Sequence, residues 1–129
     1  MDTREKIIDS EKAAARATDL RRQGTSLRVV TGHFDVLVTE HIRRLSEIAR
    51  GADKLFVVVL DPPVALLSAR ARAELVASLA MVDYVVPIGE QASEQWLSSF
   101  TAKEIVREES ADLVRADRLK QHVQRRNQQ

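Results

Sequence analysis

Cysteine is absent from the sequence, aromatic residues make up only 4% of it, and long apolar runs are missing. Without cysteine the chain forms no disulfide bond, thiolate metal site or cysteine nucleophile, and we expect it in the reducing cytoplasm. No apolar run approaches the roughly 20 residues of a membrane-spanning helix, so we expect no membrane partner. The first residues, MDTREKIIDSEK, are charged and lack the apolar segment of a signal peptide.

Charge of neither sign dominates, since 20 lysines and arginines oppose 19 acidic residues and give a net charge of +1. The basic residues of 115–126 lie near acidic ones with few aromatics between them, which is typical of a solvated helix face. We therefore expect no nucleic-acid partner. The 129 residues, of which 44% are hydrophobic and 30% charged, suffice for one globular domain with its own core.

Apolar runs and amphipathic stretches alternate along the chain. The apolar runs predict strands at 27–32, 54–60 and 84–89, with a short one within 104–109. The amphipathic stretches predict helices at 2–23, 39–54, 68–80, 93–100 and 115–126. This alternation predicts an α/β Rossmann-like fold, in which a parallel sheet of four to five strands lies between helices. The single domain, 1–129, then divides into an N-terminal helix (1–23), an α/β core (24–109) and a C-terminal helix (110–129).

Ligands of such sheets bind beyond the carboxyl ends of the strands, here 32–41 and 61–63. The first of these segments belongs to VVTGHFDVLVTEH, 29–41. This stretch resembles the cytidylyltransferase-like nucleotidyltransferases, whose pattern is T-G-x-F-D-x-x-H-x-G-H. It is most similar to the heptose-phosphate adenylyltransferase domain of lipopolysaccharide core biosynthesis. The stretches IARGADKLFVVVLD and ARAELVASLAMVDYVV resemble the same domain, and the resemblance covers residues 12–90.

The resemblance implies an enzyme that uses ATP or CTP with Mg²⁺ to transfer AMP or CMP to a phosphorylated sugar or polyol. Such chemistry depends on positioning and on neutralisation of charge, which histidines and backbone N–H groups at a helix start supply. By its place in the motif, His41 would be the catalytic residue. The nucleotide would be held by Thr31, Gly32, His33, Phe34, Asp35 and Asp61.

Two motif positions depart from the family pattern. The first histidine is replaced by Val38, which cannot donate to a phosphate. Removing one such donor typically raises the reaction barrier by about 3 kcal/mol. The motif glycine is replaced by Glu40, which adds a side chain and a negative charge beside the expected polyphosphate.

Further departures lie downstream. The loop after the second strand, DPPVALLS, lacks the glycines of the relatives and leaves Arg70 and Arg72 as the nearby cations. The relatives' K-G-G-D-Y stretch is absent, and their phosphate-contacting helix start is replaced around LVRADRLK, 113–120. These departures favour a protein that has lost catalysis.

Simpler roles compete with each functional one. His41 at a helix start also fits a surface or capping residue, and Asp35 fits either an Asx-turn or a partner for a lysine or metal. The spacing of His33, Asp35, His41 and Asp61 follows no metal motif, so we expect no metal site. Two hypotheses stand: a nonenzymatic fold relative that senses nucleotide or binds a partner, and an active small nucleotidyltransferase.

The predicted helix 2–23 also bears on assembly. It would be about 33 Å long, more than one side of so small a sheet needs. Ile7 and Ile8 lie near its start and a small-residue face follows, so part of it is free to pack on a second copy. We expect a homodimer, which the resemblance also implies.

The substitution Glu40→Gly should raise nucleotide affinity, because it removes both a charge and a side chain. Two charges about 5 Å apart interact by roughly 3 kcal/mol at an effective dielectric near 20, which limits the gain to ~100-fold. Calorimetry should give a smaller gain for Glu40→Gln, which keeps the bulk, and added salt should shrink both gains. Equal nucleotide affinities for the wild type, Glu40→Gly and Glu40→Gln would show that residues other than Glu40 prevent nucleotide binding.

Overall fold

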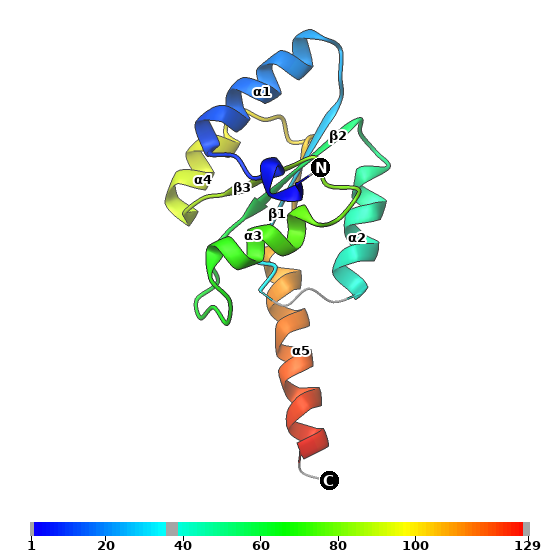
Figure 1. The fold of residues 1–129 in the computed structure, drawn as a ribbon, viewed down its shortest axis with the longest axis vertical. Helices are drawn as coiled ribbons and strands as arrows, with labels where there is room; N and C mark the ends of the chain where they lie inside the picture. Colours follow the sequence, from blue (N-terminus) through cyan, green and yellow to red (C-terminus); the bar gives the residue numbers. More distant parts are fainter. Residues whose placement is uncertain (1, 36–38, 128–129) are drawn as a thin grey trace.

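The computed structural model describes residues 2–35 and 39–127 and shows helices on both faces of a sheet (Figure 1). The helices are the 3-10 helix η1 (Thr3–Lys6), α1 (Ser10–Arg22), α2 (Thr39–Ala49), α3 (Ala69–Ala77), α4 (Glu90–Leu97) and α5 (Glu109–Asn127). The strands are β1 (Leu27–Gly32), β2 (Lys54–Val59), β3 (Tyr84–Pro87) and β4 (Ile105–Arg107). They form a parallel sheet in the order β3-β2-β1-β4. The predicted Rossmann-like α/β fold is confirmed.

The central strands have apolar residues on both faces because helices cover both. Leu55, Val57 and Val59 of β2 pack in one cluster with side chains of α2 and α3. Phe56 and Val58 of the same strand pack in a second cluster with side chains of α1 and α4. This explains why the run LFVVV shows no alternation of polar and apolar residues.

The predicted helix 2–23 is wrong in its first third. Ile7 forms a parallel bridge to Val85, and the N–H of Ile8 donates to the carbonyl of Val85 at 2.9 Å. Helix α1 begins after Asp9, whose carboxylate accepts the N–H of Lys12 at 2.8 Å. The two isoleucines therefore extend the edge of the sheet at β3. The homodimer prediction loses its argument from helix length and rests on the resemblance alone.

The remaining boundaries differ by a few residues. Ser68 caps α3, since its hydroxyl accepts the N–H of Ala71 at 3.1 Å. On this helix Leu75 is 40% exposed, whereas Arg72 is buried. Helix α5 begins six residues before the predicted 115, so its first turn lies at the carboxyl end of β4. Among the described residues, no helix is long and apolar enough to cross a membrane.

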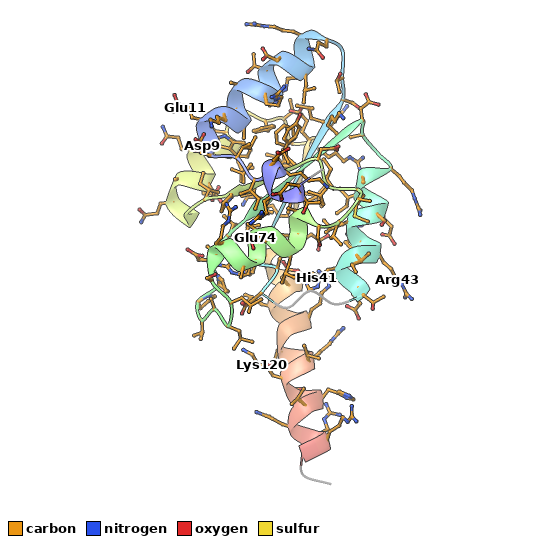
Figure 2. All side chains as sticks on the ribbon, in the orientation of Figure 1. Asp9, Glu11, His41, Arg43, Glu74 and Lys120 are labelled. Carbon is orange, nitrogen blue, oxygen red and sulfur yellow. The ribbon has the colours of Figure 1, made fainter. Side chains whose placement is uncertain are left out.

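One substitution distinguishes a helix that begins after Asp9 from a helix that runs through residue 9. If Asp9 caps α1, Asp9→Ala should lower the free energy of unfolding by about 1 kcal/mol. If one continuous helix ran through residue 9, alanine would instead stabilise it slightly, since aspartate is a poor residue within a helix. Urea unfolding of Asp9→Ala, with Glu11→Ala in the first turn of α1 as the comparison, distinguishes the two (Figure 2).

Candidate functional site

The candidate site lies where the order of strands reverses. The chain passes from β1 to β2 and β3 on one side, and β4 then returns to pair with the other side of β1. Ligands of open α/β sheets bind beyond the strand ends at such a reversal. The segment after β1, the start of α2 and the start of α5 meet at this point.

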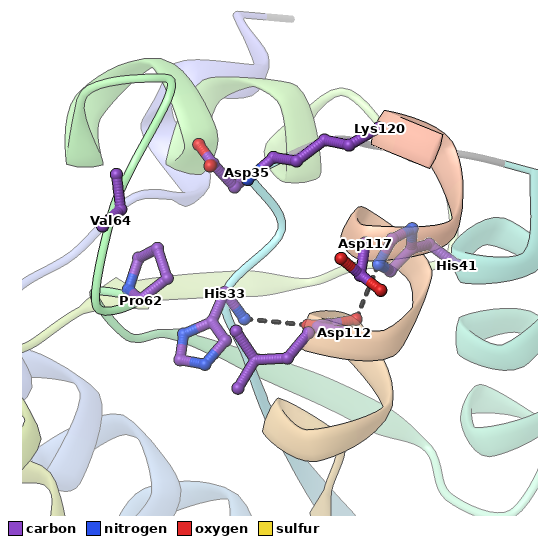
Figure 3. Close-up of a pocket in the computed structure, with 9 residues that line it drawn as sticks. His33, Asp35, His41, Pro62, Val64, Asp112, Asp117 and Lys120 are labelled. Atoms are coloured by element: carbon purple, nitrogen blue, oxygen red, sulfur yellow. Dashed lines mark hydrogen bonds and ion pairs between the residues drawn. The ribbon is translucent and has the colours of Figure 1, made fainter. Parts of the chain in front are cut away.

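The Asp112 carboxylate occupies the centre of the site. One of its oxygens, Oδ2, accepts the backbone N–H of His33 at 2.8 Å (Figure 3). The other, Oδ1, lies 2.6 Å from Nε2 of His41 and 3.0 Å from Nη1 of Arg115. Asp112 is 4% exposed and His41 is 3% exposed, so this ion pair is shielded from water. Since a carboxylate only accepts, Nε2 of His41 carries the proton in this contact.

Gly32 and Phe34 adapt the end of β1 to this carboxylate. A Cβ atom at Gly32 would collide with Oδ2 of Asp112 and with the Phe34 ring, so glycine permits the close approach. Phe34 has a φ of 52°, in the left-handed region that bulky residues rarely adopt. Its buried ring lies 5.8 Å from the His41 ring, centroid to centroid. The N–H of His33, at the end of β1, and the imidazole of His41, on α2, thus converge on the one carboxylate.

The cations beside Asp112 are already paired with carboxylates. Nε of Arg115 lies 3.4 Å from Glu40, and Nη1 lies 3.8 Å from Glu108. Nε of Arg44 donates to Glu108, and this bond raises the pKa of Arg44. An incoming phosphate would therefore meet two arginines whose charge is largely compensated by neighbouring acids.

The groups around Asp112 change the pKa of its carboxyl group. Burial raises it, but the contacts with His41, the N–H of His33 and Arg115 lower it by more, so the pKa lies below its usual value. Asp112 is therefore ionised at neutral pH, and the site holds a bound anion supplied by its own chain.

Neither arginine predicted as a nearby cation faces the site. The guanidinium of Arg72 is buried and donates to the carbonyls of His33 at 3.1 Å and Leu60 at 2.8 Å. It also pairs with Asp61. Arg70 pairs with Glu74 one turn along α3, at the surface. Arg72 thus connects the ends of β1 and β2. Asp61 forms an ion pair with Arg72, although the Asp61 side chain is 66% exposed.

Asp35 has a structural partner that neither sequence interpretation anticipated. Its carboxylate accepts the backbone N–H groups of Leu66 at 2.7 Å and Leu67 at 2.8 Å. It is therefore not explained by an Asx-turn, and it ties the loop after β1 to the loop after β2. His33 reinforces this connection, since its Nδ1 lies 3.1 Å from the Leu60 carbonyl and donates to it.

Two cavities border this region. The smaller, about 180 Å³, is lined by His33, Asp35, His41, Asp112 and Lys120 among others. The larger, about 480 Å³, is lined by His33, Leu60, Asp61, Pro62, Pro63, Glu109, Ser110 and Leu113. The described residues that line the larger cavity include two carboxylates and no lysine or arginine. Within residues 2–35 and 39–127, no group of acids and histidines is arranged to hold a metal ion.

The sequence found part of this site. His33, Asp35 and His41 come together as expected; Thr31 and Gly32 lie buried beneath them on β1, and Val38 falls outside the described residues. Figure 2 shows His41 turned toward α5, while Arg43 of the same helix points outward. The sequence missed Asp112 and Arg115. The signal that could have found Asp112 is the acid in the first turn of a helix that follows a strand.

Comparisons with known proteins place these features in context. The chain is 33% identical to the bifunctional protein HldE of Hydrogenovibrio crunogenus over 94 residues, 66% of this chain. It spans only 20% of that relative's length. A crystal structure of a lipopolysaccharide core biosynthesis protein from Thermoplasma volcanium matches with a TM-score of 0.52 and 27% identity, over 57% of this chain and 67% of that one. No protein-family model matches the sequence.

The lowered pKa of Asp112 predicts a pH-dependent stability. A carboxyl group with a lowered folded-state pKa stabilises the fold above its unfolded pKa, about 3.9, and loses that effect as the pH falls through the folded value. Asp112→Asn should therefore lower the free energy of unfolding by about 1–3 kcal/mol at pH 7. Below about pH 4 the difference from the wild type should shrink, because the unfolded chain then binds a proton at this carboxyl group more readily than the folded chain does.

Urea unfolding at both pH values measures this difference. Asp117→Asn is a matched control, since that carboxylate lies on the same helix and accepts from Gln121 of its own helix. Its unfolding free energy should follow the wild type at both pH values. A deficit of Asp112→Asn that stayed constant from pH 7 to acid would contradict the prediction.

Proposed function

The chain is a relative of the cytidylyltransferase-like nucleotidyltransferases, and we propose that it keeps their fold but has lost nucleotidyl transfer. The observation that carries this proposal is the position of the Asp112 carboxylate. It takes the imidazole of His41, which the motif would direct at a phosphate, and the N–H of His33, a residue expected to hold the nucleotide. A phosphate and this carboxylate cannot occupy the same point.

Space and charge both support the proposal. The cavity beside His41 measures about 180 Å³, whereas pockets for small-molecule ligands usually measure about 300–1,000 Å³. Asp112, Glu108 and Glu40 surround the position of the expected polyphosphate with negative charge. Of these, Glu40 is 60% exposed, so solvent screens it most. The buried Asp112 is therefore the stronger obstacle.

Loss of donors points in the same direction. Val38 stands where the family pattern has its first histidine and cannot donate a hydrogen bond. Arg70 and Arg72 are held by Glu74, by Asp61 and by backbone carbonyls. Stabilisation of the transition state by fixed donors is commonly the largest catalytic contribution, so a site with these changes should be inactive. The protein would then act as a partner-binding module of the cytoplasm.

A second candidate function is an active small nucleotidyltransferase that uses ATP or CTP with Mg²⁺. One observation favours it: His41 and the His33 N–H do converge on an anion, with Gly32 leaving room for it. Groups arranged in this way would also suit a phosphate oxygen if Asp112 were elsewhere. The acceptor would then be a phosphorylated sugar or polyol, as the resemblance implies.

Calorimetry and a transfer assay separate the two candidates. We expect no heat of binding for Mg-ATP or Mg-CTP at ~1 mM nucleotide, and no release of pyrophosphate with a panel of sugar phosphates and polyol phosphates. Binding tighter than ~100 μM together with pyrophosphate release would establish the enzyme and refute our proposal.

Light scattering on the same samples tests the homodimer, which a particle of 14.5 kDa at high concentration would exclude.

A further inference from the structure

We propose that α5 is an autoinhibitory element, which closes an intact anion site with the carboxylate of Asp112. This inference rests on the proposed function and adds the reason why the site is closed. The alternative is a site that has been dismantled, so that nothing would bind even if α5 were absent. Three features of the structure favour closure over dismantling.

The first feature is the origin of the groups that hold Asp112. The N–H of His33 comes from the end of β1 and the imidazole of His41 comes from α2, whereas Arg115 belongs to α5 itself. If α5 moved away, the carboxylate and Arg115 would leave together. The N–H of His33 and the imidazole of His41 would remain in place, because they belong to the end of β1 and to α2, and the buried Phe34 ring packs beside the His41 ring.

The second feature is the way α5 is attached. Among its described side chains, Asp112 is the single buried one, and those of residues 120–126 are all exposed. Leu113, Val114 and Val123 are 44%, 49% and 49% exposed, so α5 buries little apolar surface. Figure 1 shows the helix leaving the body and extending beyond it. Its attachment is therefore mainly ionic, through Asp112 and through Arg115 with Glu40 and Glu108.

The third feature is the chemical match between Asp112 and a competing ligand. The site already selects a planar oxyanion through a backbone N–H and an imidazole N–H, both charge-assisted contacts. A phosphate group offers more oxygens and more charge to the same donors than a carboxylate does. A polyanion of the phosphate class is thus the ligand expected to displace α5, and ionic attachments of this kind weaken as salt rises.

Pyrophosphate binding to the full-length chain tests the proposal by calorimetry at constant ionic strength. Asp112→Ala should bind inorganic pyrophosphate at least ~10-fold more tightly than the wild type, because it vacates the donors of His33 and His41. Asp117→Ala removes an equal charge from the same helix and the same cavity but leaves the Asp112 contacts in place, so it measures the effect of charge alone. Its gain should be much smaller. Adding His41→Ala to Asp112→Ala should remove the gain, which locates the bound anion.

Hydrogen exchange gives a second measurement on the same proteins. The α5 amides of Asp112→Ala should exchange faster than those of the wild type, while the amides of β1 and α2 stay protected. If Asp112→Ala does not fold, judged by circular dichroism, Asp112→Asn replaces it, because it keeps the shape of the side chain and removes the charge.

The outcomes separate this inference from the proposed function. A folded Asp112 variant with wild-type pyrophosphate affinity, or with unchanged exchange in α5, would show that the site is dismantled and would overturn autoinhibition. Nucleotidyl transfer by the wild type would instead refute the proposed loss of catalysis. The first result leaves the proposed loss of catalysis standing, so the two failures cannot be confused.

Discussion

The rest of the site depends on one buried contact, between the Asp112 carboxylate and the His41 imidazole. Burying a charge costs several kcal/mol unless other groups compensate it, so the carboxylate requires every donor around it. The N–H of His33 and the guanidinium of Arg115 supply the remainder. This requirement accounts for otherwise costly neighbours: a φ of 52° at the bulky Phe34, and a Gly32 whose Cβ would collide with the carboxylate. The end of β1, the start of α2 and the start of α5 are thereby fixed relative to one another.

Local patterns sufficed for the sheet and failed at the N-terminus. The strand at 27–32 was predicted to the residue, because an apolar run between a glycine-ended helix and a motif glycine rarely forms anything but a strand. The same logic failed for 2–23, where Ile7 and Ile8 fit the face of a helix as well as they fit an added edge strand. The sequence carries a capping residue at Asp9, but the prediction rested on the apolar positions alone. Only the long-range bridge to Val85 decides between the two interpretations.

Local sequence patterns also failed to identify all residues of the candidate site. The motif brought His33, Asp35 and His41 into view, since they are neighbours in sequence. The group that completes the site comes from α5, 71 residues beyond His41, and reaches it because β4 pairs with β1. Strand order is a property of the whole sheet, and hydrophobic periodicity carries no information about it. The sequence prediction therefore directed attention to the ends of β1 and β2. Asp112 lay within the predicted C-terminal helix, 110–129, but no local pattern connected that helix with the motif.

Glu40 connects the departures from the motif to the closed site. By sequence it is an obstacle to phosphate, a charged side chain where the family pattern has glycine. In the structure its carboxylate lies 3.4 Å from Arg115, and Arg115 lies 3.0 Å from Asp112. The residue that obstructs an external anion therefore also supports the helix that supplies the internal one. A random loss of function would give no reason for these two effects to coincide at one position. Their coincidence fits a protein in which the attachment of α5 has taken the place of the phosphate contacts of the fold.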